Sequence, residues 1–235
     1  MGLIYKMLLI LVLFNGLSHD VDVCTKPGSN NLHTKGDSIL HSKTAIIDGK
    51  KYTAINTYHN ETKRRRFDIK NQKGEIVYKG TKEEGIAIFK FVDFNNDGYK
   101  DIVLDLDVAD SGELDLVLYD PKLKKFVLAG NCSNAEKILH TPYYFSYQDC
   151  CMGREWNSEL FYITNSKIVG VGHITYSDGD GLFFYKLDGK KKTLIKRWRV
   201  RINGDTPITT GPHIDFDLKR YWTMHWRNFI SVTVY

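Results

Sequence analysis

Short apolar segments alternate with polar turn signals along most of this chain. Five stretches have the form strand, tight turn, strand: "TAIIDGKKYTAI", "FDIKNQKGEIVYK", "LVLYDPKLKKFVL", "LFYITNSKIVGV" and "FFYKLDGKKKTLI". β-branched and aromatic residues favour strands, and the Gly, Asn, Asp and Pro residues between them favour hairpin turns. The pattern predicts an all-β protein of antiparallel hairpins, without a convincing helical period in any segment.

The spacing of the turns favours a repeated architecture. Turns are predicted near residues 49, 72, 97, 121, 165 and 188. Several of these intervals are about 24 residues, so two hairpins would fill a repeat of roughly 45 to 50 residues, the size of a four-stranded propeller blade. We therefore expect a single all-β domain over residues 19–235, β-propeller-like with about four or five blades. A β-sandwich uses the same turn signals and is the alternative.

The first 18 residues, "MGLIYKMLLILVLFNGLS", predict export of the chain. One lysine precedes a short apolar run, and the small residues Gly16 and Ser18 have the spacing of a cleavage site, as in a secretory signal peptide. The run is too short to span a bilayer. A buried strand or an uncleaved anchor is the alternative. The expected location is secreted or periplasmic, with no membrane span after cleavage.

Charge excludes little apart from one class of partner. The chain carries 33 basic and 28 acidic side chains, largely interspersed, for a formal net charge of +5. A nucleic-acid-binding protein concentrates its basic residues on one face, so we expect no nucleic-acid partner.

One segment, "FVDFNNDGYKDIVLDLD" from Phe91 to Asp107, has the composition of a cation-binding loop. Calcium takes six to eight oxygen ligands, and a sharply turned loop supplies them from alternate positions and a backbone carbonyl. Gly98 would permit the turn, and Leu104 stands where an EF-hand has its closing Glu. We expect one structural Ca²⁺ ion held by Asp93, Asn95, Asp97, the Tyr99 carbonyl and Asp101. An ordinary hairpin turn with solvated acidic neighbours is the alternative.

Four cysteines in an exported chain are expected to pair. A bond between the adjacent Cys150 and Cys151 would hold their Cα atoms about 3.8 Å apart, below the usual disulfide range. The neighbours should therefore pair outward, with Cys132 the favoured partner of one of them. The place of Cys24 stays open among the three connectivities that four cysteines allow.

The loop and its flanking strands resemble known families. The pattern D-x-N-x-D-G-x-x-D at Asp93–Asp101 is similar to the calcium loops of FG-GAP and VCBS repeats. Together with "LVLYDPKLKKFVLAG" and "DCCMGREWNSELFYITNSKIVGV", it resembles a bacterial periplasmic family whose members include propeller-like immunity proteins that inhibit peptidoglycan hydrolases. The resemblance implies a calcium-stabilised binding protein whose partner is a protein, in its sharpest form a cell-wall hydrolase. It assigns no inhibitory residues.

Other features point to function less specifically. Alternation in "TLIKRWRVRIN" places Arg197, Arg199 and Arg201 on one strand face, where they would bind an acidic partner or be merely solvated. No catalytic motif occurs, so enzyme activity is not expected. The aromatic segment "RYWTMHWRNFISVTVY" is expected to form a core strand, although Trp222 and Trp226 would also suit a sugar platform. An adhesion or carbohydrate-binding module and an unrecognised hydrolase are the alternative functions.

Overall fold

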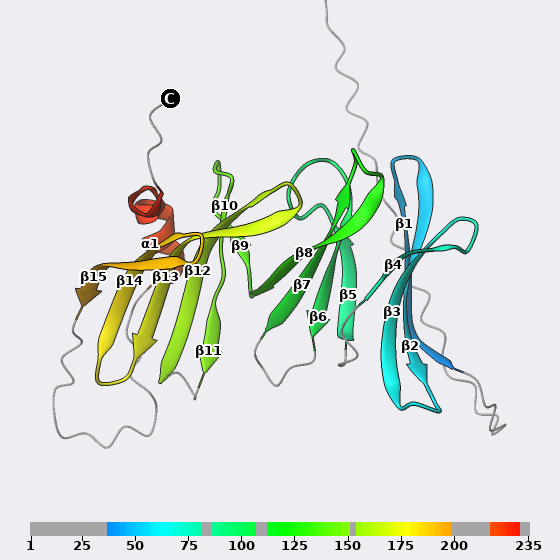
Figure 1. Cartoon of the computed structure of the whole chain (residues 1–235), viewed down its shortest axis with the longest axis horizontal. Helices are drawn as coiled ribbons and strands as arrows, with labels where there is room; N and C mark the ends of the chain where they lie inside the picture. Colours follow the sequence, from blue (N-terminus) through cyan, green and yellow to red (C-terminus); the bar gives the residue numbers. More distant parts are fainter. Residues whose placement is uncertain (1–36, 81–85, 107–111, 151–153, 199–216, 231–235) are drawn as a thin grey trace, which may run out of the picture.

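The computed structural model of the chain describes residues 37–80, 86–106, 112–150, 154–198 and 217–230. These residues form an all-β architecture of three antiparallel sheets with one short α-helix. The three sheets, A, B and C in chain order, stand side by side in a row with B in the middle (Figure 1). The predicted signal peptide, residues 1–18, lies outside the described residues.

Sheets A and B are four-stranded meanders in which each strand pairs with the next in the chain. Sheet A contains β1 (Ser38–Ile47), β2 (Lys50–His59), β3 (Arg64–Asn71) and β4 (Ile76–Lys79). Sheet B contains β5 (Ile86–Val92), β6 (Asp101–Leu106), β7 (Glu113–Asp120) and β8 (Lys125–Ser133).

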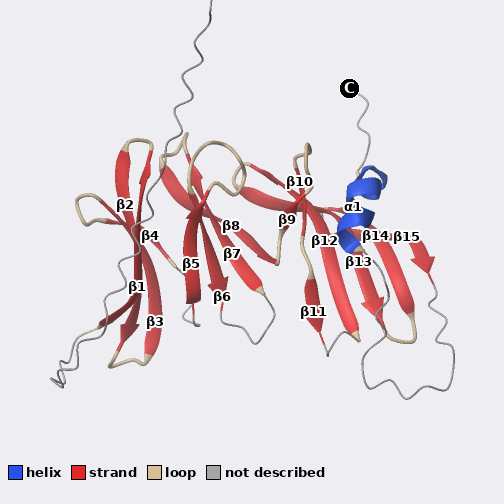
Figure 2. Ribbon diagram, turned by 180° about the vertical axis from the view of Figure 1, so that it is seen from behind, coloured by secondary structure: helices blue, strands red, loops and turns tan. Residues whose placement is uncertain are grey.

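Sheet C is larger and carries the helix. Its seven strands are β9 (Glu136–Lys137), β10 (Tyr143–Phe145), β11 (Gln148–Cys150), β12 (Glu155–Thr164), β13 (Lys167–Ser177), β14 (Gly181–Asp188) and β15 (Lys191–Trp198). The helix α1 (Leu218–His225) continues into a 3₁₀ turn (Trp226–Phe229), and both lie at the sheet C end of the molecule (Figure 2).

Sheet B is buried on both faces, which explains the continuous apolar run in β6. Ile102 and Leu104 belong to a core cluster shared with Tyr52 and Phe67 of sheet A. Val103, which points to the opposite face, belongs to a second cluster with partly buried residues of sheet C packed against it. Because successive strand residues point to opposite faces, a strand covered on both sides needs apolar residues at consecutive positions.

The far face of sheet C packs against α1. Between them lies a third core cluster, in which Trp222 is fully buried. The Trp222 indole N–H donates a hydrogen bond of 2.8 Å to the Ser158 hydroxyl. The side chain of Asp217 caps the helix by accepting from the Arg220 N–H at 2.8 Å. The prediction of a core strand in the segment 220–235 is therefore wrong for residues 220–229, and so is the prediction that the chain has no helix; residues 231–235 lie outside the described residues. The expected core role of Trp222 is confirmed, and its burial excludes Trp222 from a sugar platform.

All six predicted turns are confirmed between consecutive strands. At the first of them, Asp48 and Gly49 have φ of 50° and 69°, the backbone that a two-residue hairpin turn requires. The expected four or five blades are not seen, since the described residues form three sheets and no closed ring. Within the described ranges no helix is long and apolar enough to cross a membrane.

Candidate functional site

The loop between β5 and β6 directs its side-chain oxygens toward its own backbone. The Asp93 carboxylate accepts hydrogen bonds from the Asp97 N–H at 3.1 Å and the Gly98 N–H at 3.0 Å. The Asp97 carboxylate accepts from the Tyr99 N–H and from the Asn95 side-chain amide, both at 2.9 Å. Gly98 has φ of 90°, as the sharp turn was expected to need. The loop oxygens therefore gather on its inner side.

Asp101, the last residue of the predicted calcium loop, is completely buried. Its carboxylate accepts hydrogen bonds from the N–H groups of Phe94 at 3.0 Å and Tyr119 at 2.9 Å. Burial raises the pKa of Asp101 to about 7, although these hydrogen bonds favour the charged form. Asp101 thus fixes the start of the loop to β7 through one desolvated carboxylate.

The loop suits a hard cation in its chemistry more than in its present geometry. Every candidate ligand is a carboxylate, amide or carbonyl oxygen, the donors that calcium prefers. In the described part of the chain, however, no three His, Cys, Asp or Glu side chains converge closely enough to hold a metal ion. The carboxylate oxygens of Asp93 and Asp97 instead accept hydrogen bonds from backbone N–H groups of the loop.

Tyr144 of β10 connects this loop to sheet C. Its hydroxyl donates a hydrogen bond of 2.9 Å to the backbone carbonyl of Phe94. Its ring stacks on Phe94 at 5.1 Å and on Phe161 at 5.4 Å, with interplanar angles of 13° and 15°. Burial raises the pKa of Tyr144 to about 12, so the hydroxyl remains a donor. The three stacked rings hold the loop at a fixed position against sheet C.

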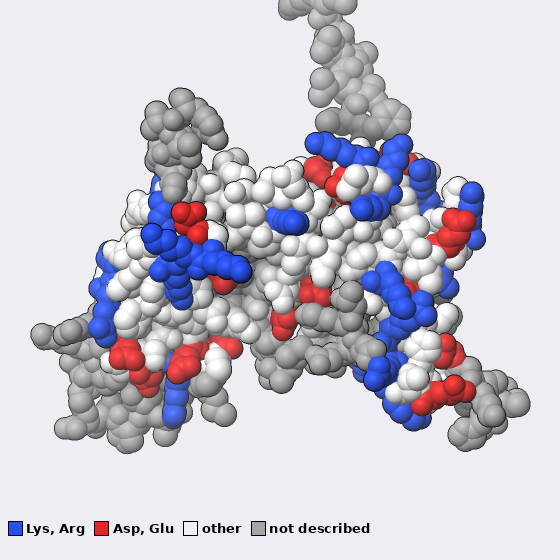
Figure 3. Space-filling view, viewed as in Figure 1, with Lys and Arg blue, Asp and Glu red and all other residues white. Residues whose placement is uncertain are grey.

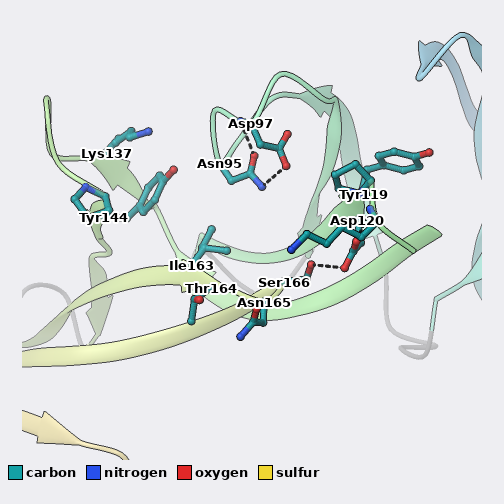
Figure 4. Close-up of a pocket in the computed structure, with 13 residues that line it drawn as sticks. Asn95, Asp97, Tyr119, Asp120, Lys137, Tyr144, Ile163, Thr164, Asn165 and Ser166 are labelled. Carbon is teal, nitrogen blue, oxygen red and sulfur yellow. Dashed lines mark hydrogen bonds between the residues drawn. The ribbon is translucent and has the colours of Figure 1, made fainter. Parts of the chain in front are cut away.

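A pocket of about 360 Å³ opens beside the loop, between sheets B and C. We call it the loop pocket. Figure 4 shows Asn95 and Asp97 above it, Tyr144 and Lys137 at the left, Asp120 and Ser166 at the right, and Ile163, Thr164 and Asn165 below. Its lining comes from four separate segments of the chain.

The charges in the loop pocket are mixed. Lys122 and Lys137 line it together with Asp97 and Asp120. Asp120 accepts from the N–H groups of Leu123 and Lys122, and these bonds lower its pKa below the ordinary value. The Ser166 hydroxyl also donates to Asp120 at 3.3 Å, which links the β12–β13 turn to the β7–β8 turn. Asp120 is therefore a fixed anion that holds two turns together.

The predicted disulfide involving Cys132 is not formed in this structure. Cys132 is a free cysteine at the sheet B–sheet C interface, and burial raises its pKa to about 12. Cys150, at the end of β11, is exposed, and no disulfide joins it to Cys132. Cys24 and Cys151 lie outside the described residues, so the remaining pairings stay predictions.

Of the predicted arginine row, the structure describes Arg197, while Arg199 and Arg201 lie outside the described residues. The Arg197 guanidinium lies 4.6 Å from the Phe183 ring centroid and donates to the Asp180 carbonyl at 3.3 Å. On the face shown in Figure 3, Lys and Arg form separate groups over sheets C and A rather than one continuous patch. Arg197 is thus held by its own sheet and does not belong to the loop pocket.

Sequence reasoning found the loop but missed most of the pocket beside it. Tyr144, Asp120 and Ser166 were not among the predicted site residues. The "YDPK" turn was recognisable, but the contact of Asp120 with Ser166 joins residues far apart in the chain and has no local signal.

Comparisons with known proteins add little to this geometry. No protein-family model matches the chain, and no curated protein matches it. Among solved structures it is similar to one titled "Structure of a Xanthomonas Type IV Secretion System related protein". That similarity has 12% identity and a TM-score of 0.42, covering 72% of this chain and 98% of that chain. A likeness this distant carries no argument about function.

Proposed function

We propose that this chain is an exported, calcium-stabilised binding protein that recognises a protein partner through the loop pocket. The observation that carries the proposal is that an oxygen-rich loop forms one wall of a pocket built from four chain segments. In its sharpest form, drawn from the resemblance of about residues 86–190 to the bacterial periplasmic family, the partner is a peptidoglycan hydrolase that the protein inhibits.

Calcium is assigned to the loop on the chemistry of its donors. Asp93, Asn95, Asp97, the Tyr99 carbonyl and Asp101 would hold the ion, which would neutralise their charge when bound. The fit is supported by the burial of Asp101, which is completely desolvated at the end of the loop, and this burial raises its pKa to about 7. An adjacent cation favours the ionised form of such a group. A single loop of this kind implies weak affinity, of order 10⁻⁴ to 10⁻³ M.

A peptide segment suits the loop pocket better than a uniformly charged ligand. The lining offers amide, hydroxyl, ammonium and carboxylate groups together with Pro121, Pro142 and Ile163. A polypeptide supplies donors, acceptors and apolar groups in the same mixture. The stack at Tyr144 and the Ser166–Asp120 bond preorganise the walls, which reduces the entropy lost on binding.

We infer a propeller-like rather than sandwich-like arrangement of the sheets. Support comes from the two covered faces of sheet B, because a blade inside a propeller has a neighbour on each side, whereas each sheet of a two-sheet sandwich has one.

The calcium assignment is tested by thermal unfolding of the full chain with added calcium and with chelator. Calcium at ten times its Kd should stabilise the folded protein by about 1.4 kcal/mol. Asp97→Ala should abolish this increment, whereas Asp188→Ala, at the exposed end of β14, should leave it intact. Identical curves with calcium and chelator would show that the loop is an ordinary turn.

The partner is tested separately by affinity capture from secreted and envelope fractions of the native organism, followed by a turbidity assay on cell walls. Capture of a hydrolase whose activity falls as the protein is added supports the proposal. Lys122→Glu and Lys137→Glu should weaken that inhibition, and Lys190→Glu in a distant turn serves as the control. A captured hydrolase that stays fully active rules out inhibition. Retention on glycans alone favours an adhesion module, and cell-wall turnover by the protein itself favours a hydrolase.

A further inference from the structure

A second pocket lies on the helix side of sheet C, away from the calcium loop. It has a volume of about 390 Å³ and is lined by residues of β9, β10 and β12, by Asn134 and Tyr147 next to these strands, and by the first residues of α1. Ligand pockets in proteins range from about 300 to 1,000 Å³, so this one is large enough for a small molecule. We call it the helix-side pocket.

Aromatic side chains form one wall of the helix-side pocket. Tyr147 and Trp156 both line it, with ring centroids 6.0 Å apart. Trp156 also packs on Tyr176 at 5.8 Å, and Phe145 beneath is only 5% exposed. Because Trp156 packs against the core cluster of sheet C, its ring presents a flat carbon surface in a fixed position, and the Tyr147 ring is inclined to it by 50°.

Polar groups line the pocket around this aromatic wall. The Lys219 ammonium lies 2.7 Å from the Glu136 carboxylate, so the two charges offset each other. Both side chains remain more than half exposed, at 70% and 52%, and can reach a ligand. The Asn134 side-chain NH₂ group donates to the Tyr147 backbone carbonyl at 3.3 Å, so the Asn134 side-chain oxygen can accept a hydrogen bond from a ligand.

The aromatic wall and the polar rim formed by Glu136, Asn134 and Lys219 together favour one class of ligand over others. An acyl chain would cover the rings but displace water from the Glu136–Lys219 pair and from Asn134 without offering them a hydrogen bond. An ionic ligand would meet a charge pair that is already neutralised. A neutral sugar has an apolar C–H face for the rings and hydroxyl groups that both donate and accept on the rim.

The geometry points to a neutral saccharide as the ligand of the helix-side pocket, with one pyranose ring stacked on Trp156 and flanked by the inclined Tyr147 ring. Its hydroxyls bond to Glu136, Asn134 and Lys219. This site differs from the sugar platform that the sequence suggested at Trp222 and Trp226. It is also independent of calcium and of the loop pocket, since the two pockets share no lining residue.

The test is calorimetric titration of the full chain with three neutral probes: tri-N-acetylchitotriose, cellotriose and maltotriose. At least one should bind, and Trp156→Ala should weaken that binding by about tenfold or more. Trp198→Ala, at the opposite edge of sheet C, should leave the affinity unchanged. If Trp156→Ala fails to fold, Glu136→Ala is the second variant and should weaken binding to a similar extent. The absence of binding by all three probes, or binding insensitive to the folded pocket variants, would overturn the assignment.

Discussion

Tyr144→Phe isolates one bond between the β5–β6 loop and sheet C. Tyr144 is 4% exposed, and its hydroxyl donates the 2.9 Å hydrogen bond to the Phe94 carbonyl. Phenylalanine keeps the ring stacked between Phe94 and Phe161, so the substitution removes the hydroxyl and little else. The position therefore separates the hydrogen bond from the packing around it.

The expected loss follows from the group left without a partner. A buried acceptor that loses its donor costs about 1–3 kcal/mol, and the partly buried Phe94 carbonyl belongs at the lower end, about 1–2 kcal/mol. For a chain of this size each kcal/mol lowers the Tm by about 2–4 °C. Tyr144→Ala removes the stack as well and should cost about 3–5 kcal/mol.

Urea unfolding of the wild type and the variant measures the difference, with Tyr185→Phe as the control. The Tyr185 ring contacts Lys192 at 4.1 Å, a contact that phenylalanine preserves. Because the Tyr144 bond forms before any ion is added, its loss should lower stability equally with and without calcium. A loss of unfolding free energy below about 0.3 kcal/mol would be no larger than the scatter expected between independent substitutions, and would refute a stabilising role for this hydrogen bond. A variant that also loses the calcium increment would show that Tyr144 organises the ion site itself.

Two further predictions concern packing and thiol chemistry. Gly172→Ala should destabilise the fold by about 1–3 kcal/mol in urea unfolding, because the added Cβ would lie 2.7 Å from the Phe229 ring. The double variant Gly172→Ala/Phe229→Leu should recover part of this loss. Cys132 should react with iodoacetamide at pH 8 about 10³-fold more slowly in the native than in the unfolded protein, because its pKa of about 12 keeps the thiol protonated. Fast labelling of the native protein, or a disulfide mapped to Cys132, would contradict this prediction.

The hairpins were predictable because their signals are local. Asn165 and Ser166, in the β12–β13 turn, have φ of 49° and 54°, and the residues that tolerate this backbone were visible in the sequence. The doubled interval between the turns near 121 and 165 also has a structural reason. It contains three strands, β9, β10 and β11, of only two or three residues each, too short to show an alternating pattern.

Helix α1 was not predicted because the high aromatic content of its segment was taken to favour a strand, and the helical spacing of its apolar residues was overlooked. Leu218, Tyr221, Trp222 and Phe229 recur at intervals of three, one and seven residues, which places them on one helical face. Asp217 immediately before them is a favourable N-cap. Both signals favour a helix, and the β-propensity of Tyr and Trp is a weaker guide than this period.

In the candidate site, too, features set by neighbouring residues were predictable, and features set by long-range contacts were not. The turn at Gly98 and the oxygen-rich composition of its loop are properties of nine consecutive residues, from Asp93 to Asp101, and could be read directly. The loop pocket, in contrast, depends on contacts between residues 50 and 46 positions apart, Phe94 with Tyr144 and Asp120 with Ser166. Such contacts exist because the apolar faces of sheets B and C bury each other. A substitution in that shared core, at Leu116 or Ile168, should therefore alter the loop pocket without touching any residue that lines it.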